Sequence, residues 1–271
     1  MKTDDCIRLS REIRIKTLEM VYNAKASHIG GAFSMADVIA VLYESVLNID
    51  PSNPNDISRD RFLLSKGHAC TALYSVLALK GFFPITHLAT YSQNKSNLLS
   101  HASHKVPGVE FSTGSLGHAL PVSTGIALGL KIKGHKNYIY TLLSDGELDE
   151  GSNWEALLFI QHHKLTNLIT IIDYNKIQSF GTTAEVINLD PLKDKLIAFN
   201  FDVIEIDGHN HSEILDAFHA AKINKLKPTI ILANTIKGKG VPFMENELLW
   251  HYKSPTKEQY DSAIKILTEQ I

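Results

Sequence analysis

The chain has 271 residues, of which 44% are hydrophobic and 21% charged, a composition typical of a globular protein. A formal net charge of -2, without a dense Lys/Arg cluster, argues against a nucleic-acid partner. No apolar run reaches the roughly 18 residues of a membrane span, and the N-terminus does not resemble a signal peptide. Cys6 and Cys70 lie far apart, which suits a reducing compartment. We therefore expect a soluble cytoplasmic protein without a membrane partner.

The first third of the chain alternates helical patterns with loops. Arg8–Lys25 carries apolar residues at helical spacing, and Met35–Leu47 predicts a second helix with Ser34 as its N-cap. The short apolar run Phe62–Leu64 follows, and then a helix is expected over Ala69–Leu79.

The second half contains short, β-branched and almost continuous apolar runs. They cover Tyr138–Leu143, Leu168–Ile172, Val203–Ile206 and Thr229–Ala233. Helical patterns lie between them, over Trp154–His163, about Pro191–Phe199, and Ser212–Lys225. Strands buried on both faces and separated by helices predict a parallel sheet with right-handed crossovers. We therefore expect an α/β fold, a doubly wound and mainly parallel sheet with helices on both faces, as one domain over residues 1–271.

Two of the predicted strands end in short polar side chains. Asp145-Gly146 follows the first, and Asn175 follows the next, thirty residues later. An Asp-Gly pair after a strand is commonly only a turn, and Asn in a loop commonly caps local backbone. The spacing is more informative, because one crossover brings both side chains to the ends of neighbouring strands, where such folds bind ligands. Carboxylate and amide oxygens there suit a hard divalent cation bound to phosphate.

This arrangement resembles the fingerprint of thiamine-diphosphate enzymes. The resemblance implies that Asp145, Asn175 and the backbone carbonyl of Ile177 hold Mg²⁺ or Ca²⁺. It also implies that Gly146, Asn175 and Ile177 contact thiamine diphosphate. Ser144 departs from the family pattern, which has glycine at this position. Serine is small, so we expect the geometry to be kept.

Further stretches resemble transketolase in particular. They are Ser27–Gly31, Ser65–Ala69, Thr113–Gly117, Asp145–Ala156, Ile236–Gly240 and Trp250–Pro255. They occur in transketolase order and extend over about residues 10 to 255. The chain thus resembles the N-terminal, diphosphate-binding half of a transketolase.

The resemblance assigns catalytic roles to four histidines: His28, His68, His101 and His251. A histidine beside small residues in a loop is by default only solvated. In transketolases, however, histidines in these stretches contact the sugar, and the equivalents of His68 and His251 also contact the cofactor. Neutral imidazole can donate and accept, which suits polyol recognition and proton transfer near pH 7. An alignment shifted by one residue would give the role of His251 to Tyr252.

Three more segments complete the expected cofactor site. Gly114, Ser115 and Leu116 precede a helical pattern, so their backbone N–H groups can face the diphosphate. Glu150 is assigned to the cofactor site because its family equivalent lies at the dimer interface between two such sites. His118 departs from the glutamine that transketolases often have after Leu-Gly.

A whole transketolase also contains a pyrimidine-binding domain, which supplies the glutamate that activates the cofactor. Here the motifs run almost to the C-terminus, leaving only the tail 257–271. The resemblance therefore implies a separate C-terminal transketolase subunit, carrying the pyrimidine-binding and C-terminal domains, in an α2β2 heterotetramer. The enzyme would transfer a two-carbon ketol unit from a ketose to an aldose, with sugar or sugar-phosphate substrates. The alternatives are the α subunit of a 2-oxo-acid dehydrogenase and a non-catalytic thiamine-diphosphate-binding relative.

Overall fold

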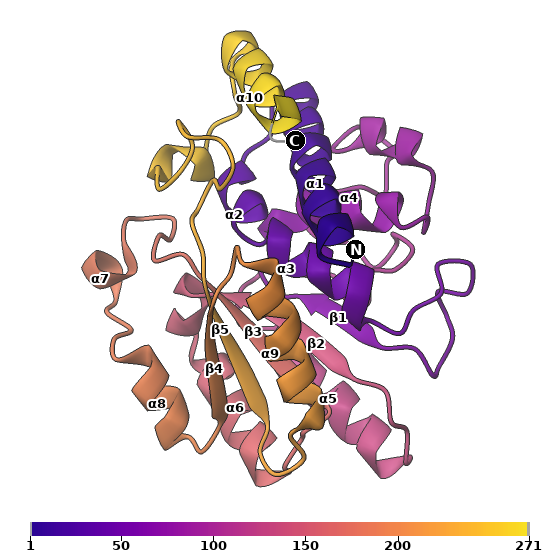
Figure 1. Cartoon of the computed structure of the whole chain (residues 1–271), viewed down its shortest axis with the longest axis vertical. Coiled ribbons are helices and arrows are strands. Elements are labelled where there is room, and N and C mark those ends of the chain that lie inside the picture. The colour runs from indigo at the N-terminus through magenta and orange to yellow at the C-terminus, as the bar shows by residue number, and fades with distance from the viewer. Residues whose placement is uncertain (1, 270–271) are drawn as a thin grey trace.

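The computed structural model describes residues 2–269 and has one central sheet of parallel strands, in the order β1-β2-β3-β5-β4 (Figure 1). The strands are β1 (Arg61–Leu64), β2 (Ile139–Ser144), β3 (Leu168–Tyr174), β4 (Asp202–Asp207) and β5 (Thr229–Asn234). Every neighbouring pair is parallel. The predicted parallel α/β sheet is confirmed. β5 lies between β3 and β4, so the order in space differs from the order along the chain.

Helices cover both faces of the sheet (Figure 1). One face packs against α5 (Ala119–Ile132), α6 (Gly151–His162) and α8 (Leu192–Ala198). The other packs against α1 (Lys2–Ala24), α3 (Ala36–Val41), α4 (Cys70–Leu79) and α9 (His211–Ile223). In β1, Phe62 and Leu64 point to the face covered by α1, α3, α4 and α9, whereas Leu63 points to the face covered by α5, α6 and α8. Both faces are buried, which explains the continuous apolar runs of the strands.

Shorter elements connect these layers. They are α2 (Ile29–Ser34), the π-helix η1 (Leu42–Val46), α7 (Thr183–Val186), and the 3₁₀ helices η2 (Gly67–Ala69), η3 (Ile85–Thr90), η4 (Gly146–Asp149) and η5 (Leu248–His251). Near the C-terminus, α10 (Lys257–Glu269) packs on α1 (Figure 1). A third apolar core, which includes Leu18, Trp250 and Leu267, joins α1 to the C-terminal segments. The loop before η5 is thereby held close to α2.

The helix predicted over Met35–Leu47, with Ser34 as its N-cap, is wrong in its start. Ser34 is the last residue of α2, and α3 begins at Ala36 after Met35. The Ser34 hydroxyl lies near the Gly31 carbonyl (3.0 Å) and the Asp173 carboxylate (2.6 Å), so it caps no helix. Within residues 2–269, no helix is both long and apolar enough to cross a membrane.

Candidate active site

The carboxyl ends of β2 and β3 bring Asp145 and Asn175 to the same edge of the sheet. Asp145 is buried, and its carboxylate accepts hydrogen bonds from the backbone N–H of Lys176 and, at 2.7 Å, of Gly146. Burial, together with the nearby Asp173 carboxylate, raises the pKa of Asp145 to about 6. A cation at this edge would stabilise the charged form of Asp145.

The side-chain amide of Asn175 is held at both of its polar atoms. Its Nδ2 donates to Asp173 Oδ2 at 3.0 Å, and its Oδ1 accepts from the backbone N–H of Ile177 at 3.1 Å. This leaves the second lone pair of Oδ1 for another partner. Asp173 therefore orients Asn175, a role that the sequence interpretation did not assign, although the two residues are only two positions apart.

A buried ion pair supports this orientation. Lys66 and Asp173 are each about 1% exposed, and the Lys66 ammonium bonds Asp173 Oδ2 and the Gly31 carbonyl, the latter at 2.8 Å. Burial alone would raise the pKa of Asp173, but Lys66 and the hydrogen bonds from Ser34 and Thr235 together outweigh burial and lower it. The sequence interpretation noted Lys66 only as part of a motif. Its burial depends on a partner from another strand end.

A second lysine reaches the same edge from the loop after β5. Lys237 is 2% exposed, and its Nζ donates to the Ile177 carbonyl at 2.9 Å and lies 3.3 Å from His251 Nδ1. Burial, with a smaller contribution from Lys66, lowers its pKa to about 8. Lys237 is thus mainly charged at pH 7. It is a functional candidate that the sequence interpretation left without a role.

The four predicted histidines form one cluster. The ring centroid of His28 lies 5.1 Å from that of His68, 6.0 Å from that of His101 and 5.0 Å from that of His251. His28 has a φ of 71°, and its backbone N–H donates to the His251 carbonyl at 3.0 Å. A left-handed backbone conformation is uncommon for residues other than glycine, and histidine is among those that adopt it more readily.

Three of these histidines are held in the neutral form. Burial lowers the pKa of His28 to about 4, with His101 and Lys237 adding to the effect. Burial also lowers the pKa of His251 to about 3 and that of His68 well below its usual range. At pH 7 each ring therefore has one donor nitrogen and one acceptor nitrogen.

One cavity of about 200 Å³ collects most of the predicted residues. Those that line it are His28, His68, His101, Gly114, Leu116, Asp145, Gly146, Asn175, Ile177 and His251. Ser115 and Glu150 are exposed and do not line it, so their contacts with the cofactor stay predictions. Tyr252 lines a neighbouring cavity of about 320 Å³, and its hydroxyl donates to the Ser179 carbonyl at 2.5 Å.

Glu147 joins the loops around this cavity. Its buried carboxylate accepts hydrogen bonds from the Ser65 hydroxyl, from Gly117 N–H at 2.8 Å and from Ser144 N–H at 3.3 Å. The three donors belong to three different segments, each of which carries a predicted cofactor contact. Glu147 is a further residue whose role sequence reasoning missed, because a Glu in a loop is by default solvated.

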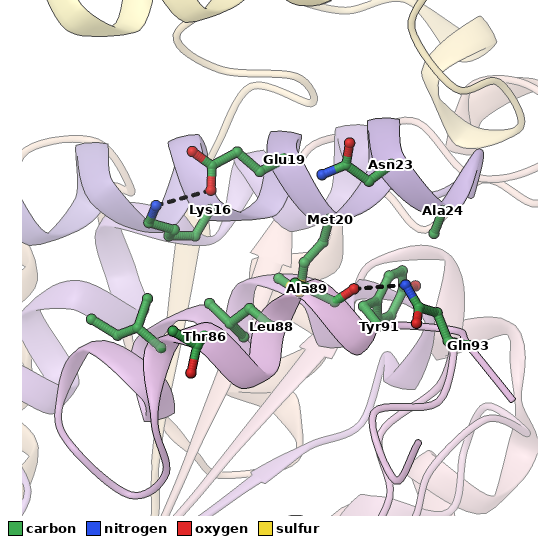
Figure 2. Close-up of a pocket in the computed structure, with 11 residues that line it drawn as sticks. Lys16, Glu19, Met20, Asn23, Ala24, Thr86, Leu88, Ala89, Tyr91 and Gln93 are labelled. Carbon is green, nitrogen blue, oxygen red and sulfur yellow. Dashed lines mark hydrogen bonds and ion pairs between the residues drawn. The ribbon is translucent and has the colours of Figure 1, made fainter. Parts of the chain in front are cut away.

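Another cavity, of about 240 Å³, lies between α1 and η3 (Figure 2). Its charged lining residues, Lys16 and Glu19, pair with each other at 2.9 Å, and Gln93 donates to the Ala89 carbonyl (Figure 2). Paired groups of this kind offer little chemistry to a substrate. We therefore place the candidate active site at the cavity of the histidine cluster.

Comparison with known proteins shows the family of this chain. The family model for the transketolase, thiamine diphosphate binding domain matches residues 7–266. An apulose-4-phosphate transketolase subunit of Phocaeicola vulgatus is 40% identical over 262 residues, which cover 97% of this chain and 93% of the relative. A 6-deoxy-6-sulfo-D-fructose transketolase subunit of Clostridium sp. is 44% identical over 259 residues, covering 95% of this chain and 94% of the relative.

Solved structures give the same result for the fold. Transketolase from Campylobacter jejuni superposes with a TM-score of 0.93 at 31% identity. The match covers 98% of this chain and 43% of that transketolase, so this chain spans less than half of the larger enzyme. The strand-end Asp and Asn, the histidine cluster and the family match agree, and the chain belongs to the transketolase family, as its thiamine-diphosphate-binding N-terminal domain.

Proposed function

We propose that this chain is the diphosphate-binding subunit of a two-chain transketolase, which transfers a two-carbon ketol unit from a ketose to an aldose. The observation that carries the proposal is the convergence of Asp145, Asn175 and four histidine rings on one cavity. The relatives that match almost from end to end are named as transketolase subunits.

The residues at the strand ends fit a diphosphate with its metal. Asp145, Asn175 Oδ1 and the Ile177 carbonyl would hold Mg²⁺ or Ca²⁺, because all three are oxygen donors and one is charged. The raised pKa of Asp145 supports this assignment, since a cation relieves the cost of its buried charge. A Cβ on Gly146 would lie 2.7 Å from the Gln178 side chain, so only glycine allows the backbone and Gln178 to approach this closely.

The remaining cavity residues provide for the cofactor and the sugar. We assign His68, Gly114 and Leu116 to the diphosphate, and the Lys237 ammonium adds positive charge beside it. His28, His101 and His251 would bind the hydroxyls and carbonyl oxygen of the sugar and move protons there. When bound, thiamine diphosphate supplies the nucleophilic carbon that takes up the two-carbon unit.

The partner is a separate C-terminal subunit with the pyrimidine-binding domain, and we propose an α2β2 assembly. Helices α5 and α6, which pack against each other, expose apolar side chains: Ile132 is 76% exposed and Leu158 is 61% exposed. Gly125 and Gly129 on α5 have open space where a Cβ would be. We propose that another chain of the assembly covers this face of α5 and α6. The relatives that this chain matches over 93% and 94% of their own length are named as transketolase subunits, which supports a partner on a separate chain.

The relatives also indicate the class of substrate. One is named for apulose 4-phosphate and another for 6-deoxy-6-sulfo-D-fructose, both anionic sugars. We propose a sugar or sugar-phosphate donor with an acidic group for this chain as well.

Cys6 and Cys70 are free thiols and agree with a reducing compartment, the cytoplasm.

The test is metal-dependent cofactor binding and turnover. Calorimetry with thiamine diphosphate and MgCl₂ should show binding to the chain mixed with its partner subunit. Asp145→Ala and Asn175→Ala should abolish it, whereas Asp216→Ala, on the exposed face of α9, should not. Full activity of either site variant at limiting Mg²⁺ would contradict the metal assignment. Binding without ketol transfer in the mixture would favour the non-catalytic alternative, and ketol transfer by this chain alone would refute the need for a partner.

A further inference from the structure

A second buried cluster lies next to the loop that carries Lys237. The Arg14 guanidinium holds the Asp37 carboxylate with two hydrogen bonds, of 2.9 and 2.6 Å, and the two side chains are only 7% and 6% exposed. Burial alone would raise the pKa of Asp37, but Arg14, a hydrogen bond from His209 and the His211 ring, whose Nε2 lies 3.3 Å from Asp37 Oδ1, hold it well below its usual range. The Asp37 carboxylate is therefore ionised near neutral pH, and its oxygens act only as hydrogen-bond acceptors.

His209 connects this carboxylate to the loop. The backbone N–H of Ile236 donates to His209 Nε2 at 2.8 Å, so Nε2 carries no proton. The proton of the neutral ring is then on Nδ1, which donates to Asp37 Oδ2 at 2.8 Å. Asp37 thus fixes both the orientation and the tautomer of His209.

Arg14 binds the same loop at a second point, beyond Lys237. Its Nε donates to the Lys239 carbonyl at 2.9 Å. The two contacts, at Ile236 and Lys239, flank Lys237 and Gly238. Gly238 has a φ of 80°, and its N–H donates to the Gly30 carbonyl at 3.0 Å. The turn that presents Lys237 to the Ile177 carbonyl is therefore held from both ends.

We propose that His209 is a positioning residue, which holds the backbone at Ile236 so that the Lys237 ammonium points at the diphosphate and metal site. His209 does not line the cavity of the histidine cluster; it lines a separate one with Arg14 and Asp37. It acts through the loop alone. The inference rests on the proposed function, because the site that Lys237 serves is the one assigned to the diphosphate.

Two substitutions separate positioning from general stability. In His209→Gln the amide oxygen reaches the position of Nε2 and can accept from Ile236 N–H, while the bond to Asp37 is lost. In His209→Asn the amide nitrogen takes the place of Nδ1 and keeps Asp37, while Ile236 N–H loses its acceptor. Each variant loses one hydrogen bond, so similar melting temperatures are expected. His219→Asn, on the exposed face of α9, is the matched control.

The readout is the Kd for thiamine diphosphate in MgCl₂, measured by calorimetry on the full chain mixed with its partner subunit. We expect His209→Asn to bind about tenfold more weakly, the effect of one hydrogen bond of about 1.4 kcal/mol, and His209→Gln to stay within about threefold of the unaltered chain. In a Lys237→Met background, His209→Asn should change the Kd by less than about twofold. Equal weakening in both His209 variants, or an undiminished effect in the Lys237→Met background, would overturn the proposal.

A second measurement is independent of the cofactor. Amide hydrogen exchange at Ile236 should be about tenfold faster in His209→Asn than in His209→Gln, because only the former leaves this N–H without its acceptor. If the unaltered chain mixed with its partner subunit does not bind thiamine diphosphate, the proposed function fails, and this exchange still tests the His209 contact. Identical exchange in the two variants would refute it.

Discussion

Lys66→Met is expected to destabilise the protein strongly, because it leaves Asp173 charged and buried without its cation. Both partners are about 1% exposed, and the pair lies within the sheet edge that carries Asn175. Breaking a buried ion pair by removing one partner costs about 3–5 kcal/mol. For a chain of this size that corresponds to a melting temperature lower by about 10 °C. The assay is urea unfolding at pH 7 together with a thermal melt.

Two further variants make this expectation specific. Lys193→Met removes an ion pair with Glu205 of 2.9 Å, but its partners are 47% and 38% exposed, so it should cost less than about 1 kcal/mol. Lys66→Met with Asp173→Asn should recover about 2 kcal/mol, since no unpaired charge remains buried. A Lys66→Met variant that melts like Lys193→Met, or a double variant no more stable than Lys66→Met, would refute the reasoning.

The pH dependence of the unfolding free energy tests the same ion pair between Lys66 and Asp173. In the unaltered protein the pKa of Asp173 is lowered, so its stabilising contribution is complete above the unfolded pKa of about 3.9 and is lost as the pH falls through the folded value. In Lys66→Met, burial without the lysine raises the pKa of Asp173. Protonation then relieves the buried charge, and the difference in unfolding free energy between the two proteins should narrow from pH 7 to pH 5.

Two other predictions concern the histidines. The folded pKa values of His28 and His251 are lowered to about 4 and about 3, so the unfolded chain binds more protons than the folded chain below about pH 6.5. The free energy of unfolding should therefore fall as the pH drops from about 6.5 towards 4. Nitrogen NMR should find both rings neutral at pH 6, and protonated rings there would contradict the burial argument. His251→Ala should lower ketol transfer by roughly tenfold to ten-thousandfold, while Tyr252→Phe should have little effect; the reverse result in steady-state assays with the partner subunit would assign the role to Tyr252.

The sequence determined the elements and the edge of the sheet where the candidate site lies. Phe62 and Leu64 enter one core while Leu63 enters the other, and burial on both faces is what the continuous apolar runs predict. The polar residues Asp145 and Asn175 follow two such runs, and parallel pairing alone brings them together. These inferences succeed because they depend on local pattern and on the direction of the chain.

The residues that support the site were decided by the tertiary structure. Lys66 pairs with Asp173 at a separation of 107 residues, and Lys237 bonds the Ile177 carbonyl at a separation of 60. Taken locally, each lysine is a solvated charge, and Ser34 is a helix cap until Asp173, 139 residues away, comes within hydrogen-bonding distance of its hydroxyl. The place of β5 between β3 and β4 is equally absent from any local pattern. A buried charge is stable only beside its partner, and only the folded chain brings the two together.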